Sequence, residues 1–419
     1  MTSFYIETYD TLYSADAEQM AGLLQQAKFE YKEKLEDADI VIMNTCAANS
    51  HAIDSFLTRL NTIKQEYPYK MMVVTGSLPR IVPERFKNFT IVGTRQFHHI
   101  VEAVEETLHN NIVKMLDTSE MPPLDAPKIR KNKFLEMIPI SREGVKIQAK
   151  NKPETATLDS YPKADIVKVA TKAVQEGVTE IWLTSPDCAG YGFDLGTNLP
   201  DLLKEFIQIP GNFKIRLDKC HPASLKKVET ELFPLFTHEK MFKCIHIFFQ
   251  SGSNKVLAQM QQAHTKEECI ELVQQIRDIE PHITLVADMV VGYPTETDDD
   301  QWDTLNLLRA INADAVNISK FWEKPATGRA APLAEEVVAR RTAVIMDLVR
   351  NISTLRNERW KGWEGSIIIS EKGTLPNQWI GRNEYYKPIM VEGEYKIGDT
   401  MNVRIAKAGT VELKGEKIE

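Results

Sequence analysis

Cysteine is scarce in this chain of 419 residues. The five cysteines, Cys46, Cys188, Cys220, Cys244 and Cys269, are widely spaced and form no CxxC pair. This spacing argues against a disulfide framework and favours a reducing compartment. The sequence therefore predicts a cytoplasmic protein.

Two further absences narrow the class of protein. No run of about eighteen apolar residues is present, and the N-terminal MTSFYIETYD lacks a basic stretch followed by an apolar core. The sequence therefore predicts neither a membrane span nor a signal peptide. The formal net charge of -8 argues against a surface that is wholly a nucleic-acid footprint, whereas local basic patches are compatible with it.

Apolar residues make up 43% of the chain, which at this length is enough for two or three globular domains. In residues 1–112, short apolar runs such as 39–45 alternate with helical patterns, which predicts a parallel sheet. Ligands gather at the carboxyl ends of the strands in such sheets, here around Asp10, Cys46 and Ser77. A lone cysteine after a buried strand is more often a small apolar side chain than a reactive one.

Residues 113–136 contain prolines and mixed charges and predict an extended linker. Residues 137–335 then alternate between strand and helix patterns, which predicts a (β/α)6 partial barrel with right-handed crossovers. The strand candidates are 138–148, 180–185, 214–217, 244–249, 284–292 and 315–319.

Polar residues at and near the strand ends indicate a ligand pocket. A polar group in an apolar barrel costs about 1–3 kcal/mol when it is unpaired, so it is usually kept for a ligand or a polar neighbour. The alternative is a polar layer whose members bond only to one another. The candidate pocket residues are Thr184, Ser185, Asp187, Arg216, Gln250, Ser251 and Asp288.

Two cysteines and a histidine on the same face give a further hypothesis. Cys188, Cys220 and His221 follow strand ends, and two thiolates with an imidazole can bind zinc. Their spacing matches no short zinc motif, so unrelated small residues are the simpler interpretation.

Residues 336–419 begin with a helical pattern and continue as short strands with glycine turns, which predicts a small antiparallel β-barrel. Aromatic and cationic residues interleave in this module, as they do on surfaces that stack single-stranded bases. Some of them must fill the small core instead. The RNA-binding candidates are Arg359, Trp363, Arg382, Tyr385 and Lys387.

Ordered motifs run along nearly the whole chain: ADIVIMNTCA, VVTGSLPR, SYPKADIV, QSGSNKVLAQM, DMVVGYPTETDDD and GDTMNVRI. Together they resemble the archaeal and eukaryotic threonylcarbamoyladenosine tRNA methylthiotransferases, a radical SAM family. The resemblance implies an N-terminal methylthiotransferase domain, a radical-SAM-like partial barrel and a C-terminal TRAM barrel, which is the order derived above.

The departures from that family fall on its cluster positions. The family holds one [4Fe-4S] cluster, which binds S-adenosylmethionine, on a CxxxCxxC loop whose positions here are Arg142, Lys146 and Ala149. It holds a second cluster on three cysteines of the first domain, whose positions here are Asp10, Cys46 and Ser77. Because an iron–sulfur cube needs thiolate donors, we expect no [4Fe-4S] cluster and only weak S-adenosylmethionine binding.

The leading hypothesis is a cluster-free pseudoenzyme that binds tRNA, or a ribosome-associated assembly of RNA and protein, without methylthiolating it. One alternative is a role in the thiomethylation of threonylcarbamoyladenosine that requires an active paralogous partner. Another is new chemistry in the barrel. We expect no radical SAM methylthiotransferase activity from the chain alone.

Overall fold

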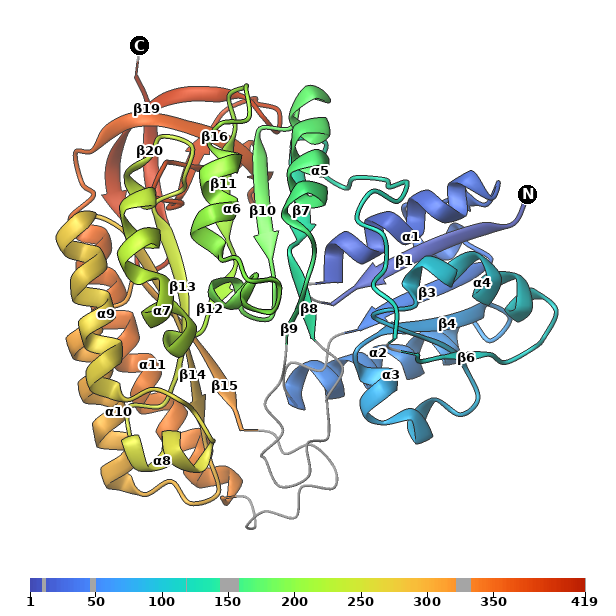
Figure 1. Ribbon diagram of the computed structural model, residues 1–419, viewed down its shortest axis with the longest axis horizontal. Coiled ribbons are helices and arrows are strands. Elements are labelled where there is room, and N and C mark those ends of the chain that lie inside the picture. The colour runs from blue at the N-terminus through green and yellow to red at the C-terminus, as the bar shows by residue number, and fades with distance from the viewer. Residues whose placement is uncertain (10–12, 46–49, 118, 144–157, 322–332, 419) are drawn as a thin grey trace. The chain divides into compact units, whose positions relative to one another are not determined.

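Figure 1 shows a computed structural model that describes residues 1–9, 13–45, 50–117, 119–143, 158–321 and 333–418. The chain forms two compact units. Unit 1 comprises residues 1–139, 143–159 and 320–328, and unit 2 comprises residues 140–142, 160–319 and 329–419.

Unit 1 contains a parallel six-stranded sheet in the order β2-β1-β3-β4-β5-β6. Apolar side chains pack in two clusters, one around Phe4 and one around Phe56, as expected of a parallel sheet buried on both faces. The helices and strands of this sheet are β1 (Ser3–Thr8), α1 (Ser14–Gln26), β2 (Glu30–Tyr31), β3 (Ile40–Thr45), α2 (Ser50–Glu66), β4 (Met71–Gly76), α3 (Leu78–Ile81), β5 (Thr90–Gly93), α4 (Ile100–Leu108) and β6 (Lys114–Met115).

The segment between β6 and β7 (Leu135–Pro139) packs along α1. The side-chain amide of Gln19 donates to the carbonyl oxygen of Leu124 at 2.8 Å. The backbone N–H of Ile129 donates to the carbonyl oxygen of Glu18 at 2.9 Å. The predicted linker is therefore hydrogen-bonded to a helix of unit 1.

A glycine and a buried ion pair hold this segment close to the helix. A Cβ at Gly22 would lie 2.3 Å from backbone atoms of Pro127 and Lys128, so only glycine permits this approach. The carboxylate of Glu136, which is fully buried, pairs with Lys128 and with Arg130.

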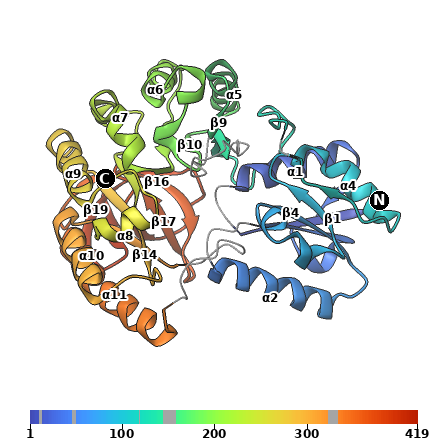
Figure 2. The same cartoon turned by 60° about the horizontal axis from the view of Figure 1, so that its bottom comes forward.

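Strands β10 to β15 of unit 2 form two hydrogen-bonded sets. In the first, β10 pairs with β11 in parallel. The second has the order β12-β13-β14-β15, in which β13 pairs in parallel with β12 and with β14. The helices cover one face of these strands, and the other face is the inner side of the curve (Figures 1 and 2). On β14, Ala287 and Met289 are buried, whereas the intervening Asp288 is only half-buried. The alternation assigns Asp288 to the inner face. These strands and helices are α5 (Lys163–Gln175), β10 (Glu180–Thr184), α6 (Leu199–Phe206), β11 (Lys214–Leu217), β12 (Lys219–Cys220), α7 (Pro222–Leu232), β13 (Cys244–Gln250), α8 (Asn254–Gln259), α9 (Lys266–Ile279), β14 (Thr284–Val291), α10 (Asp298–Ile311), β15 (Ala315–Lys320) and α11 (Glu335–Glu358). The chain passes between the units in β8 (Ser141–Glu143), in β9 (Leu158–Ser160) and again at the end of β15.

The C-terminal strands close into a small barrel in the order β16-β17-β18-β20-β19. Alternate residues of β19, such as Val403 and Ile405, fill its core together with Ile367 and Leu413. The predictions of an α/β protein with a parallel N-terminal sheet and a small C-terminal barrel are confirmed. The strands of this barrel are β16 (Glu364–Lys372), β17 (Gln378–Arg382), β18 (Pro388–Glu392), β19 (Thr400–Ala408) and β20 (Leu413–Lys417).

A buried ion cluster joins the two parts of unit 2. Asp314, just before β15, accepts from Arg356 of α11 at 2.9 Å and from the ammonium of Lys387 at 2.7 Å. All three residues are at most 6% exposed. No helix in the described ranges is both long and apolar enough to cross a membrane.

Candidate functional site

A polar cluster lies on the inner face of the strands of unit 2. Oδ1 of Asp288 on β14 lies 2.6 Å from Nε2 of His246 on β13 and accepts from Nδ2 of Asn317 on β15 at 2.8 Å. The ring of His246 stacks on the ring of Phe248, with centroids 6.1 Å apart. The Nζ of Lys219 on β12 lies 5.3 Å from the centroid of Phe248.

The electrostatics of this cluster keep Asp288 ionised. Burial, the largest single effect, raises the pKa of Asp288, but the contacts with His246, Asn317 and Lys219 together outweigh burial. The net result is a pKa below the ordinary value. A carboxylate that orients an imidazole can bind a polar ligand and exchange a proton with it.

Sequence reasoning found Asp288 but missed His246. The available signal was a histidine in the middle of CIHIFF, an otherwise apolar strand pattern, because a polar residue at such a position usually has a buried partner.

The predicted pocket residues after β10 form a local network. The hydroxyl of Ser185 lies 2.5 Å from that of Ser141 and accepts from the backbone N–H of Asp187 at 3.0 Å. The carboxylate of Asp187 accepts from the backbone N–H of His221 at 2.9 Å. Oγ1 of Thr184 is buried and has no hydrogen-bond partner among the described residues. Ser185 and Asp187 thus stabilise the rim of the strands.

Gln250 and Ser251, the two predicted pocket residues at the end of β13, determine the path of the backbone there. Gln250 adopts a left-handed conformation with φ of 66°, next to a register shift between β13 and β14. Ser251 is 2% exposed, and its hydroxyl accepts from the backbone N–H of Ser253 at 3.2 Å. Ser251 therefore maintains the turn that follows the strand.

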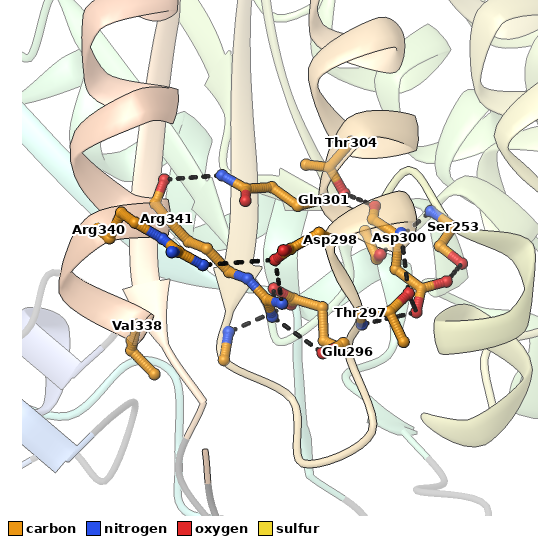
Figure 3. Close-up of polar contacts among 12 residues, drawn as sticks. Ser253, Glu296, Thr297, Asp298, Asp300, Gln301, Thr304, Val338, Arg340 and Arg341 are labelled. Carbon is orange, nitrogen blue, oxygen red and sulfur yellow. Dashed lines mark hydrogen bonds and ion pairs between the residues drawn. The ribbon is translucent and has the colours of Figure 1, made fainter. Parts of the chain in front are cut away.

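The loop after β14 is fixed by an arginine of α11 (Figure 3). Arg341, 4% exposed, donates to a carboxylate oxygen and to the backbone carbonyl of Glu296 and to the carboxylate of Asp298, at 2.8, 3.0 and 2.8 Å. The other carboxylate oxygen of Glu296 accepts from the backbone N–H of Gly292 at 3.2 Å. A Cβ at Gly292 would lie 2.8 Å from a methyl group of Val338, so the loop lies directly against α11.

A second anchor of this loop is the capping box of α10, shown on the other side of Figure 3. Asp300 accepts from the backbone N–H and the hydroxyl of Thr297 at 2.8 and 2.7 Å, and from the hydroxyl of Ser253 at 2.7 Å. Burial raises the pKa of Asp300, but the hydrogen bonds of Ser253, Lys255 and Thr297 hold it well below its usual range. The motif YPTETDDD therefore supports the rim of the site.

Arg216 does not join the cluster around Asp288. Its guanidinium carbon lies 4.4 Å from the ring centroid of Trp182 and 4.7 Å from that of Tyr386, which belongs to the C-terminal barrel. A cation between two aromatic faces is stabilised there. Arg216 therefore joins the strands to the C-terminal barrel.

Two of the RNA-binding candidates, Lys387 and Tyr385, also make contacts where the strands of unit 2 meet the C-terminal barrel. Lys387 is 4% exposed and pairs with Asp314, so its ammonium is turned to a buried carboxylate and presents no exposed charge to RNA. The ring of Tyr385 packs against Trp360 with centroids 5.0 Å apart, and the Nζ of Lys243 lies 5.0 Å from its centroid.

The other RNA-binding candidates are more accessible. Arg359 is exposed and Trp363 is half-buried. Arg382 donates to the carboxylate of Glu371 at 2.8 Å. Arg359 is therefore the candidate whose charge is most accessible to a phosphate.

The zinc hypothesis finds no support in the geometry. Burial raises the pKa of both thiols, Cys188 and Cys220, well above the usual value. Both nitrogens of His221 have partners, the backbone N–H of Ala223 at 3.3 Å and the side chain of Gln262 at 2.7 Å. The single group of three ligand-type side chains that comes together in the described part of the chain does not include these residues.

Two of the positions that the family resemblance assigns to cluster ligands lie in the described part of the chain, and neither side chain is a thiol. Arg142 is 7% exposed, and its Nε donates to the hydroxyl of Tyr161 at 2.8 Å. Ser77 offers a hydroxyl in place of a thiolate. The remaining positions, Lys146, Ala149, Asp10 and Cys46, lie outside the described residues.

The fold and the matching domains define the class of protein. The structure is similar to the radical S-adenosylmethionine methyltransferase TsrM from Kitasatospora setae, with a TM-score of 0.52 and 11% identity over 76% of this chain and 75% of that chain. At this identity the likeness concerns the fold alone. Residues 4–92 match the uncharacterized protein family UPF0004 and residues 361–418 match the TRAM domain. The chain thus has a radical-SAM-like fold with a TRAM domain.

Comparison with relatives gives the family. The chain is 32% identical to a probable threonylcarbamoyladenosine tRNA methylthiotransferase of Methanothermobacter thermautotrophicus, over 96% of this chain and 97% of the relative. It is 30% identical to the threonylcarbamoyladenosine tRNA methylthiotransferase of Xenopus laevis, over 97% of this chain and 75% of the relative. The chain belongs to the threonylcarbamoyladenosine tRNA methylthiotransferase family.

Proposed function

We propose that this protein binds tRNA and takes part in the methylthiolation of threonylcarbamoyladenosine together with a partner that carries the iron–sulfur clusters. The observation that carries this proposal is the end-to-end match to methylthiotransferases, which spans 96% of the chain and includes the TRAM domain. Because the chain matches these relatives over almost its full length, we expect it to act on tRNA, as their names indicate for them.

The chemistry of the donors supports the need for a partner. Of the six positions that correspond to family cluster ligands, only Cys46 is a cysteine. The four cysteines within the described ranges are buried, and burial raises the pKa of each thiol, which opposes the thiolate form that iron requires. We therefore expect this chain to hold no cluster of its own and to bind S-adenosylmethionine only weakly.

The first test separates chemistry from binding. Protein reconstituted anaerobically with iron and sulfide is expected to hold far fewer than about four irons per chain, the content of one cube. The same preparation is expected to bind tRNA in a filter assay at low salt. About four irons per chain with a brown colour would contradict the proposal, and so would the absence of tRNA affinity.

The second test concerns the partner. tRNA that carries threonylcarbamoyladenosine is incubated with a cysteine-complete homologue from the same cell, with and without this protein, and its nucleosides are measured by mass spectrometry. Faster or more complete thiomethylation in the presence of this protein supports the proposal. Unchanged thiomethylation, with tRNA binding intact, would instead favour a protein whose role is limited to RNA binding.

A further inference from the structure

A pocket opens on the C-terminal barrel, with a volume of about 300 Å3. It is lined by the turn between β16 and β17 and by the residues that follow β18, with Lys372, Trp379, Glu394 and Tyr395 among its side chains. Trp379 is one of the aromatic residues that interleave with cations in this module, but neither it nor the other three side chains are among the five RNA-binding candidates named from the sequence.

The walls of the pocket are held in place by hydrogen bonds. The indole N–H of Trp379 donates to the carbonyl oxygen of Gly393 at 3.1 Å, and the backbone N–H of Gly393 donates to the carbonyl oxygen of Asn377 at 2.9 Å. Gly393 has a φ of 146°, and a Cβ there would lie 2.9 Å from the ring of Tyr395. The indole of Trp379 is thus held in place before a ligand arrives, which lowers the entropy that binding loses.

The side chains of the pocket offer two kinds of contact to a base, an aromatic surface and a hydrogen-bond acceptor. Trp379 and Tyr395 are half-buried, so each keeps part of its surface accessible. The Nζ of Lys372 lies over the ring of Trp379, 5.6 Å from its centroid, so a base that stacks on this face takes the place of the ammonium. The exposed carboxylate of Glu394 would repel a phosphate, but it can accept a hydrogen bond from the amino group of a base.

We propose that this pocket holds an unpaired nucleobase of the bound RNA, one with an exocyclic amino group, stacked against Trp379. The proposal rests on the proposed function, because it names the part of the RNA that the C-terminal barrel recognises. Leu375, 65% exposed at the rim, would cover the outer edge of the base. Aromatic side chains recognise unpaired RNA bases in this way in other proteins.

The test is a titration of the full chain with short single-stranded RNAs made of A, C or U, followed by tryptophan fluorescence. Trp379→Ala is expected to weaken binding of the A and C oligomers about tenfold, the loss typical of one stacked base. Glu394→Ala is expected to remove the preference for A and C over U. Lys407→Ala, which removes an exposed lysine of β19 that does not line the pocket, is the matched surface control and is expected to retain both affinity and preference.

A second variant distinguishes loss of stacking from misfolding of the barrel. Trp379→Phe keeps an aromatic ring, so it is expected to retain most of the affinity but to lose most of the fluorescence quenching caused by the oligomer. Full quenching in Trp379→Phe would overturn the proposal that the base stacks on Trp379. Unchanged affinity in a folded Trp379→Ala would also overturn it, and this is the result expected of a pocket that binds a peptide instead. Failure of the wild-type chain to bind any RNA overturns the proposed function instead.

Discussion

Asp314 lies between two cations that come from distant parts of the chain, Arg356 and Lys387. Burial raises the pKa of its carboxyl group, but Lys387 and Arg356 outweigh burial and hold the pKa below its ordinary value. Removing the carboxylate alone leaves buried cations without their counter-charge. This destabilises a protein more than replacing the whole ion cluster by apolar side chains would.

Asp314→Asn is therefore expected to lower the free energy of unfolding by about 3 kcal/mol at pH 7. Because the folded pKa is depressed, the contribution of Asp314 is present above its unfolded pKa of about 4 and is lost as the pH falls through the lower folded pKa. The difference between the variant and the wild type should therefore shrink in acid. Urea unfolding at neutral and acidic pH measures this.

The matched control is Asp347→Asn, which removes a carboxylate that is 76% exposed and paired with Arg350 on α11. An exposed pair of this kind contributes less than about 1 kcal/mol. Equal losses in the two variants would mean that the buried cluster contributes no more than a surface ion pair.

Glu18 on α1 gives a prediction of the opposite sign. Its side chain is 5% exposed, and burial raises its pKa to about 7, although the backbone N–H of Lys131 donates to it at 3.0 Å. The folded state therefore binds a proton that the unfolded state releases near pH 4.5, and stability falls as the pH rises toward 7. Glu18→Gln, which keeps the acceptor, is expected to stabilise the protein by about 1–3 kcal/mol at pH 8 and not at pH 4.5.

Chemical unfolding at the two pH values checks this expectation. Glu105→Gln, at an exposed position of α4, serves as the control and should change stability equally at both. A Glu18→Gln variant with no gain at pH 8 would show that the carboxylate is not destabilising when it is charged.

For single residues, the sequence pattern predicted which strand a side chain lies on, but it did not predict which side chains contact it. Asp288 was identified from its position in TLVADMVVG, and the structure adds His246 beside it. The partners of Arg216 and Lys387, by contrast, are Tyr386 and Asp314, which lie 170 and 73 positions away in the sequence. Periodicity carries no information about such distant contacts, so these cations were assigned to ligands.

At the scale of elements, Gly22 tests how the 113–136 segment is held on α1. Glycine inside a helix usually destabilises it relative to alanine by about 0.5–1 kcal/mol, so Gly→Ala normally stabilises. Here the added Cβ would lie 2.3 Å from backbone atoms of Pro127 and Lys128. Gly22→Ala is therefore expected to lower the free energy of unfolding by about 1–3 kcal/mol and to expose residues 119–134 to protease.

Thermal unfolding and limited proteolysis measure the two effects. Gln25→Ala, at an exposed position of the same helix, is the control and is expected to change stability by less than about 0.5 kcal/mol. Stabilisation by Gly22→Ala would show that the segment does not lie this close to the helix.

Elements with a strong pattern were predictable from the sequence. The strands expected at 180–185, 214–217, 244–249, 284–292 and 315–319 match β10, β11, β13, β14 and β15 to within one residue at each end. The two-residue strands β2, β6 and β12 were missed, because two residues are too short to show a period. Of the strand expected at 138–148, the described part forms β8 and the end of β7.

At the scale of the whole molecule, the charge balance limits how the protein can hold RNA. The chain has 51 Lys and Arg against 59 Asp and Glu, so affinity for tRNA must come from local cations and from stacked bases. These two contributions respond differently to salt, since only the neutralisation of phosphates releases counterions.

Raising the salt concentration from about 50 to 200 mM is therefore expected to weaken tRNA binding about twentyfold, the change expected from roughly three phosphate contacts. Arg359→Ala, which removes an exposed cation, is expected to reduce the slope of log affinity against log salt by about 0.7. Trp379→Ala should lower the affinity at every salt concentration and leave the slope unchanged, because a stacking ring releases no counterions. Filter binding over a salt series gives both quantities, and a reduced slope in Trp379→Ala with an unchanged slope in Arg359→Ala would assign the two residues the opposite roles.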